Sequence, residues 1–266
     1  MRKSINTDNS SFDTRLKKIW EEKGIPSLFI VFILCLWEWS IHAKWIKETL
    51  LPAPSKVVLA LVNHFEFLQV HVWVTAKETL LGFLIAILFG ILLAVLMDQF
   101  TLIKRAFYPL LVISQTVPLI ILAPLFAIWF GFGLAPKIVI VVMVCFFPIV
   151  ISLFEGLESA DQDMINLMRS MNATRFQIFR YVKFPSGMVG FFSGLRIAAT
   201  YSVMGAVIGE WTGSSKGLGS YMIRSRNAFA LDRAFAAVIL IVIMSWIMFK
   251  AVDLIQHFAT PWNRAK

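Results

Sequence analysis

Apolar residues along this chain come in long uncharged blocks separated by polar segments. Residues 79–97 form one such block, and a helix of about 17 or more apolar residues can cross a hydrocarbon core roughly 30 Å thick. Residues 106–154 form a longer tract interrupted only by Lys137. This tract is too long for one span, and its Gly- and Pro-containing break at residues 131–136 is typical of a turn. It therefore predicts two membrane helices.

The same pattern predicts an all-α membrane protein with about six transmembrane helices. The expected spans are residues 26–43, 75–97, 106–130, 137–154, 188–209 and 233–258. Residues 1–25 and 259–266 are expected to be polar tails. Between the first two spans we expect an external loop carrying a short helix with Ser55 as its N-cap.

Composition supports a bilayer as the solvent, because 58% of the residues are hydrophobic, more than is usual for a soluble domain. The net charge of +9 is first an orientation signal, since lysines and arginines resist translocation, so it predicts no nucleic-acid partner. Most cations outside the spans lie in the N-terminal tail, at Lys104 and Arg105, within residues 155–185 and near the C-terminus. We therefore expect both termini and residues 155–185 to face the cytoplasm, and no removable signal peptide.

Catalytic and cofactor chemistry is not predicted for this chain. No pair of histidines at zinc-ligand spacing and no serine with a nearby histidine occurs at span depth. The Gly-rich string from Gly213 to Gly219 lacks the residue order of a phosphate-binding loop. Cys35 and Cys145 lie in apolar stretches and predict neither a disulfide nor a metal site. We expect a non-enzyme that binds no ATP itself.

The segment 155–185 is too long to serve only as a link between two spans. Its apolar residues recur at helical spacing and predict two short helices with exposed faces. Asn172 falls at the expected bend, where asparagine tolerates the left-handed conformation that ends a helix, and Pro185 is expected to stop the second helix. An amphipathic hairpin lying on the membrane surface is the alternative interpretation.

This segment resembles the cytoplasmic coupling loop of ABC importer permeases. That loop has Glu-Ala-Ala, three residues, Gly, nine residues and Ile-x-Leu-Pro; here the register is kept, although the letters differ. The resemblance implies that the ATPase-coupling residues are Asn166, Leu167, Met168, Arg169, Met171, Asn172, Ala173, Phe176, Val182, Phe184 and Pro185. The glutamate of the family pattern is replaced by Asn166, which removes any polar contact that the glutamate would make.

The resemblance covers nearly the whole chain after the N-terminal tail. Leu51-Pro-Ala-Pro-Ser-Lys-Val57 and Phe147-Pro-Ile resemble the branch that imports nitrate, sulfonates, taurine and thiamine-type pyrimidine precursors. Gly209-Glu-Trp-Thr-Gly213 with Gly217-Leu-Gly-Ser-Tyr-Met222 is most similar to the pyrimidine-precursor members. The resemblance implies a type I ABC importer permease in a bacterial inner membrane. Its implied partners are a dimer of ATPase subunits that bind ATP, a second permease copy and an extracytoplasmic binding protein.

Residues of the fifth expected span are our hypothesis for the translocation pathway or its gate. They are Arg196, Ala198, Gly205 and, at the end of the span, Glu210. Arg196 lies deep enough that it should face the bundle interior or water. The alternative is that the small residues only pack against other spans of the same chain, and that Glu210 is solvated or hydrogen-bonded. A secondary transporter and, more remotely, an intramembrane enzyme are the rival functions.

Overall fold

The computed structural model describes residues 24–261, and these form helices and connecting segments only. The expectations for the two tails therefore lie largely outside the described residues. In chain order the elements are α2 (Ile25–His42), α3 (Pro54–Asn63), α4 (Phe65–Gln99), α5 (Thr101–Ser114), α6 (Leu119–Phe130), α7 (Ala135–Glu158), α8 (Gln162–Ser170), α9 (Arg175–Ile178), the π-helical turn η2 (Phe179–Lys183), α10 (Phe184–Glu210), α11 (Leu218–Asn227) and α12 (Leu231–Ala259). The all-α prediction is confirmed for this part of the chain.

Five helical segments among the described residues are long and apolar enough to cross a membrane. They are α2, α4, α7, the continuous segment from Arg175 to Glu210, and α12. Helices α5 and α6, which correspond to the expected span 106–130, meet at 105°. They are a broken span or a re-entrant loop. Pro118 precedes α6 directly, and a proline cannot continue the hydrogen-bond ladder of the helix before it.

Two sequence-based boundaries need correction. Residues 65–74, expected to be part of an external loop, are the first turns of α4, which begins at Phe65. Pro185 does not stop a helix: η2 and α10 follow α9 without interruption, and Pro185 lies in the first turn of α10. Within this continuous segment Pro185 removes one backbone hydrogen bond, and the π-helical turn η2 lies directly before α10, in which Pro185 is the second residue.

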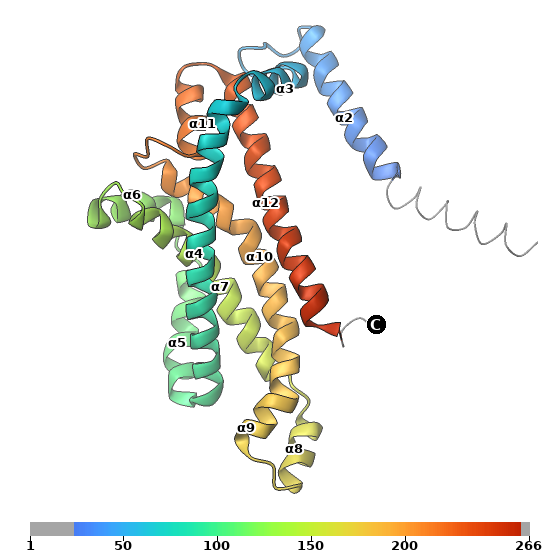
Figure 1. Cartoon of the computed structure of the whole chain (residues 1–266), viewed down its shortest axis with the longest axis vertical. Coiled ribbons are helices and arrows are strands. Elements are labelled where there is room, and N and C mark those ends of the chain that lie inside the picture. Colours follow the sequence, from blue (N-terminus) through green and yellow to red (C-terminus); the bar gives the residue numbers. More distant parts are fainter. Residues whose placement is uncertain (1–23, 262–266) are drawn as a thin grey trace, which may run out of the picture.

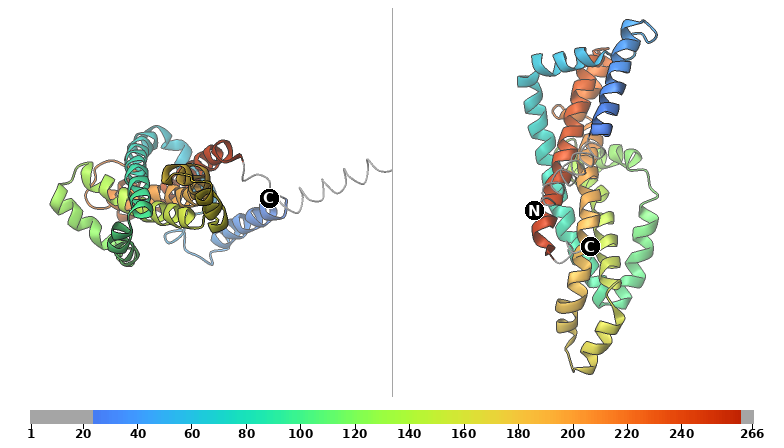
Figure 2. Two further views of the ribbon diagram at one scale, coloured as in Figure 1. Left: turned by 90° about the horizontal axis from the view of Figure 1, so that it is seen from below. Right: turned by 90° about the vertical axis from the view of Figure 1, so that its right-hand side faces the viewer.

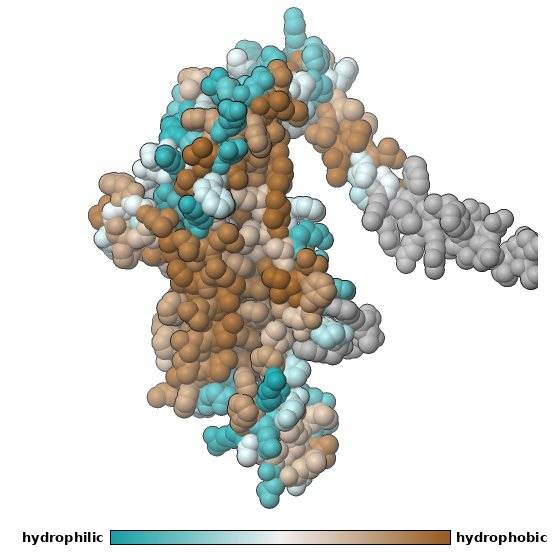
Figure 3. Space-filling view, viewed as in Figure 1, coloured by the Kyte–Doolittle hydropathy of each residue, from teal (hydrophilic) through white to brown (hydrophobic). Residues whose placement is uncertain are grey.

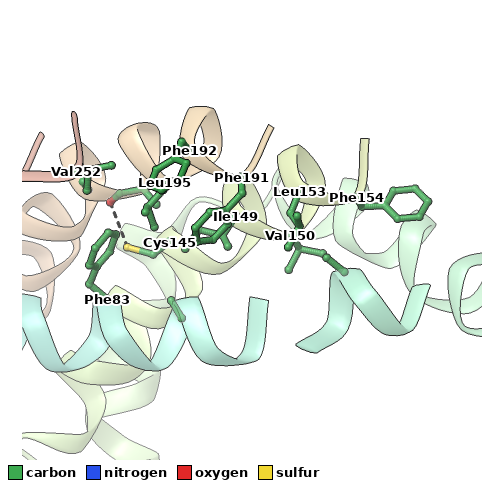
Figure 4. Packing of buried hydrophobic residues seen from close by; sticks show 14 of the residues in the cluster. Phe83, Cys145, Ile149, Val150, Leu153, Phe154, Phe191, Phe192, Leu195 and Val252 are labelled. Atoms are coloured by element: carbon green, nitrogen blue, oxygen red, sulfur yellow. Dashed lines mark hydrogen bonds between the residues drawn. The ribbon is translucent and has the colours of Figure 1, made fainter. Parts of the chain in front are cut away.

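The core forms where α7 and α10 cross (Figure 4). At the crossing, Cys145 Sγ lies 3.3 Å from Ala198 O and donates a hydrogen bond to it. A Cβ placed on Gly190 of α10 would lie 3.0 Å from the Cα of Gly156 on α7. Close packing of this kind replaces the hydrophobic effect between helices in lipid. Gly82 of α4 lies equally close to α7, since a Cβ placed on it would lie 2.5 Å from the Cβ of Val141.

Helices α4, α5, α7, α10 and α12 run roughly along one long axis, whereas α3 and α6 lie across it (Figure 1). The surface is polar at both ends of this axis, with an apolar band between them (Figure 3). Helices α3 and α11 lie at one end, and α8 and α9 lie at the other (Figures 1 and 2). Helix α2 stands to one side, and Glu38 on it accepts hydrogen bonds from the N–H and hydroxyl of Ser55 at 3.0 and 2.7 Å. Ser55 is therefore not an N-cap as expected: α3 begins at Pro54, and a carboxylate from α2 satisfies its first turn.

Candidate coupling and transport site

The hairpin of α8 and α9 is held by local capping. Asp161 precedes α8 and its carboxylate accepts the N–H of Asp163 at 2.8 Å. Thr174 precedes α9 and forms a reciprocal capping box with Gln177. These caps satisfy first-turn N–H groups that have no partner within the helix. Both helices therefore begin at sequence-encoded positions.

Asn172 ends α8 in the left-handed conformation, with φ of 62°. Its N–H donates to Arg169 O at 3.0 Å, and the N–H of Ala173 donates to Met168 O at 2.9 Å. This pair of bonds is a Schellman motif, which closes a helix through one left-handed residue. The conformational prediction for Asn172 is confirmed.

The apolar side chains of the hairpin divide into a buried and an exposed set. Ile165 and Ile178 are buried against Ala160, with Met168, Ala173 and Val182 packed beside them. Leu167, Met171 and Phe176 are exposed at 56%, 74% and 73%. We call Met164, Leu167, Met171 and Phe176 the exposed apolar face. The sequence pattern had not separated these two sets, because both recur at helical spacing.

The other predicted coupling residues lie on α8 and at the start of α10. Asn166 is exposed on α8, and Phe184 and Pro185 form the start of α10. Arg169 lines a polar recess near the turn between α4 and α5, where Lys183 Nζ lies 2.6 Å from Asp98 Oδ1.

A buried polar cluster at the opposite end was missed as a group in the sequence. Glu78 of α4 pairs with Lys137 of α7 at 2.6 Å, and Lys137 donates to Ser214 Oγ at 2.8 Å. Glu210 accepts the hydroxyl of Thr75 at 2.5 Å. Charged side chains standing alone beside apolar blocks were the available signal, because such groups must find partners when buried.

This cluster fixes the segment between α10 and α11. Glu210 also accepts the N–H of Gly219 at 2.5 Å. The N–H of Gly217 donates to His71 Nδ1, and the N–H of Leu218 donates to Thr75 Oγ1, both at 2.9 Å. Glu210 is 1% exposed, so of the two expected environments the hydrogen-bonded one holds.

A cavity of about 470 Å³ lies beside α7 and α10, closed on another side by the α5–α6 bend. Its hydrogen-bonding side chains are those of Ser114, Gln115, Ser152 and Tyr201. The remaining lining is apolar: Val117, Leu119, Val144, Phe147, Pro148, Ile151, Ile197 and Met204. None of these lining residues carries a charge.

The small-residue face of α10 does not line this cavity. Ala198 is fully buried, and a Cβ placed on Gly205 would lie 3.2 Å from the Cα of Val141 on α7. Neighbouring helices of the same chain occupy that face, which corresponds to the alternative interpretation given above. Arg196 lies elsewhere, with Nη1 3.8 Å from Asp253 Oδ1 on α12.

Residues 86–264 match the family described as the binding-protein-dependent transport system inner membrane component. The chain belongs to this family. It is 35% identical over 241 residues to the formylaminopyrimidine transport permease protein ThiX of Halalkalibacterium halodurans, a match that covers 90% of this chain and 96% of ThiX. It is 26% identical over 272 residues to the taurine transport system permease protein TauC of Escherichia coli, covering 98% of each chain.

The fold of this chain is similar to that of a solved ABC transporter permease. A chain of the inward-facing MetNI methionine ABC transporter superposes with a TM-score of 0.61 at 21% identity, covering 73% of this permease and 97% of that chain. The protein is an ABC importer permease of the branch expected from its sequence, with the permease fold. The relatives named above are transport permeases, so this chain is a membrane protein of a transport family.

Proposed function

We propose that two copies of this permease form the translocation pathway of an ABC importer. An ATPase subunit docks on the α8–α9 hairpin of each copy, and an extracytoplasmic binding protein delivers the solute to the other end. The family description names binding-protein-dependent transport. The observation that carries the proposal is the exposed apolar face at the tip of the hairpin.

The position of this face favours a protein partner over lipid. The hairpin lies beyond the apolar band and is surrounded by polar surface (Figures 1 and 3). Met171 and Phe176 are nearly three-quarters exposed there. Large apolar side chains that are grouped on the surface outside a membrane are typical of a protein interface. Methionine and aromatic side chains adapt well to such an interface. Docking at the hairpin thus has both the surface and the chemistry that it needs.

The cavity beside α7 and α10 supports pairing of two copies. It is lined by Ile197, Tyr201 and Met204, which follow one another at helical spacing and are exposed at 46–48%. A second copy facing this stripe would close the cavity into a pathway. This revises the expected lining of α10 from Ala198 and Gly205 to the stripe beside it.

The chemistry of the cavity favours an uncharged, planar solute. Aromatic side chains at Phe147 and Tyr201 offer stacking surfaces, and Gln115 and Ser152 offer hydrogen-bonding groups. An anion such as nitrate, taurine's sulfonate or another sulfonate favours a cationic side chain, and the lining has none. We therefore propose a pyrimidine precursor of the kind named for the relative ThiX, with taurine, sulfonate or nitrate as the second candidate.

The proposed orientation places the hairpin and both termini in the cytoplasm. Lysines and arginines concentrate in the segments that this orientation assigns to the inside. Helices α3 and α11 then face outward, where a binding protein would dock. Cysteines at Ser170 and Ser215, in a variant lacking the exposed Cys35, test this arrangement: an impermeant outside reagent should label only position 215.

The docking proposal is tested by co-purification with the ATPase subunit of the same transport system. Phe176→Asp and Met171→Asp place a charge on the exposed apolar face, so we expect at least about a tenfold loss of association. Phe229→Asp is the matched control, because Phe229 is 88% exposed at the opposite end of the molecule. Association of both hairpin variants at the wild-type level would refute docking on this face.

Pairing is tested by single cysteines along α10 in purified complex. Cysteines at Ile197, Tyr201 and Met204 should crosslink between copies, whereas cysteines at Ala198 and Gly205 should not. The reverse pattern, or a complex with one permease copy, would contradict the pairing proposal. The substrate is tested separately by measuring which solute stabilises the cognate binding protein against heat: formylaminopyrimidine is expected, and selective stabilisation by taurine would overturn the assignment.

A further inference from the structure

A second cavity, of about 650 Å³, lies between α10 and α12. Its charged and polar lining consists of Arg196, Lys250, Asp253, Gln256, His257 and Thr260. The transport and docking proposals assign no role to it.

The lining of this cavity carries more positive than negative charge, because the two cations Arg196 and Lys250 face one carboxylate, that of Asp253. Asp253 is shared: one oxygen lies 3.8 Å from Arg196 Nη1 and the other 3.5 Å from Lys250 Nζ. One carboxylate therefore faces two cations, and both distances exceed those of a tight charged hydrogen bond. Within residues 24–261, which the structure describes, Asp253 is the one carboxylate that lines the cavity beside Arg196 and Lys250, so the three groups leave one positive charge for an anion.

Both cations lie on helices that are long and apolar enough to cross a membrane, α10 and α12. An uncompensated charge on such a helix is costly. Their side chains remain 34% and 51% exposed. Charged groups within spans pair with other groups or reach water or headgroups, so a ligand that brings negative charge to this position is favoured.

The lining changes from apolar to polar along α12. Trp246, which is 60% exposed, lies at one end of the cavity, and Thr260 lies at the other. Beyond Trp246 the apolar stripe continues through Val242 and Ile243, both exposed. A phospholipid changes from polar to apolar in the same way: its anionic headgroup would match the charged end of the cavity, and its acyl chains would match the apolar stripe.

We propose that this cavity binds the headgroup phosphate of an anionic phospholipid of the cytoplasmic leaflet. Arg196 and Lys250 contact the phosphate, Asp253 positions both cations, and the acyl chains follow the α12 stripe past Trp246. The choice of leaflet rests on the orientation given under the proposed function. Lipid binding itself depends on neither the ATPase nor the substrate.

The experiment measures lipid retention and thermal stability of the full-length permease purified in detergent. Wild-type protein should retain phosphatidylglycerol in native mass spectrometry and gain thermal stability from it, but not from phosphatidylcholine. The double variant Arg196→Gln/Lys250→Gln should lose about tenfold or more in apparent affinity, because each basic group near an anionic headgroup is worth about 1 kcal/mol. Arg105→Gln is the matched control, an exposed cation on α5 outside the cavity.

Three results would overturn the proposal. They are equal stabilisation of the wild type by both lipids, the same stabilisation by inorganic phosphate alone, or a change of copy number in the double variant without loss of lipid. The charge-preserving variant Arg196→Lys/Lys250→Arg should retain phosphatidylglycerol, so a double glutamine variant that merely misfolds is recognised. Failure of this test leaves the docking proposal untouched, because the experiment does not measure ATPase association, and the pairing proposal keeps its own test by crosslinking of α10.

Discussion

The two ends of this permease differ in how far their side chains find partners within the chain. At the α3–α11 end, Glu210, Thr75 and His71 accept backbone N–H groups and tie the segment before α11 to α4. At the hairpin end the backbone is equally well capped, yet the exposed apolar face remains uncovered. The first end closes on itself through polar bonds, whereas the second leaves apolar area for a partner. Substitutions at the two ends should therefore differ in what they disturb, stability at one and association at the other.

The largest effect is expected from Glu78→Leu. Glu78 is 2% exposed and pairs with Lys137 at 2.6 Å; its loss leaves the lysine with Ser214 as its hydrogen-bond partner. Removing one member of a buried ion pair costs about 3–5 kcal/mol, seen as a clear fall in the thermal unfolding midpoint of purified protein. The double variant Glu78→Leu/Lys137→Leu should recover part of the loss, since no charge is then left unpaired. A double variant less stable than the single one would contradict this account.

Much of the fold follows from the sequence because apolar blocks must cover a bilayer. The block at residues 79–97 and the break after Gly131 indicated α4 and the start of α7, both of which the structure contains. The beginning of α4 at Phe65 was missed, because the additional turns at residues 65–74 carry Glu66 and His71 and do not have the composition of a membrane span. A helix can extend beyond its apolar block: α4 has 35 residues, whereas the uncharged block within it covers only residues 79–97.

The sites were predicted unevenly for a similar reason. The hairpin is local in sequence, so the left-handed helix end at Asn172 could be predicted from the residue type and its position at the bend. The cluster of Glu78, Lys137 and Glu210 joins three helices, and its members lie 59 or more positions apart. No periodicity reports such a contact. Spacing could not choose between the faces of α10 either, since Ala198 and Tyr201 are both compatible with a span and only packing separates the buried Ala198 from the exposed Tyr201.

A smaller effect is expected from Gly190→Ala at the α7–α10 crossing, which links the two ends. The added Cβ would lie 3.0 Å from the Cα of Gly156, and backbone cannot yield as a flexible side chain does. Overpacking of this kind costs about 1–3 kcal/mol, again measured by thermal unfolding. Gly133→Ala is the control, because a Cβ there would meet nothing within 4 Å. Equal effects of the two changes on the unfolding midpoint would show that α7 and α10 can move apart at the crossing without loss of stability.

Asn172→Ala should have a still smaller effect, confined to the hairpin. Asn172 has φ of 62°, and an alanine held in that region costs about 1–2 kcal/mol, somewhat less when measured against asparagine. Asn172→Gly removes the strain and should match or slightly exceed wild-type stability. Hydrogen exchange of α8 amides is the suitable measurement, because it detects local opening. Faster exchange in the glycine variant than in the alanine variant would argue against the left-handed helix end.

The smallest effect on stability is expected from Phe176→Asp, the same change that should weaken ATPase association by at least about tenfold. Phe176 is 73% exposed, so its ring contributes little to folding, and an exposed substitution of this kind costs within about 0.5 kcal/mol. Ile165→Asp is the informative contrast, because Ile165 is 2% exposed and a carboxylate there would be buried among Ala160 and Ile178. Thermal unfolding of the two variants should separate them clearly, with only Ile165→Asp destabilised. If Phe176→Asp were destabilised as strongly, the aromatic ring would be part of the hairpin's own core, and the contrast between a closed end and an end awaiting its partner would fail.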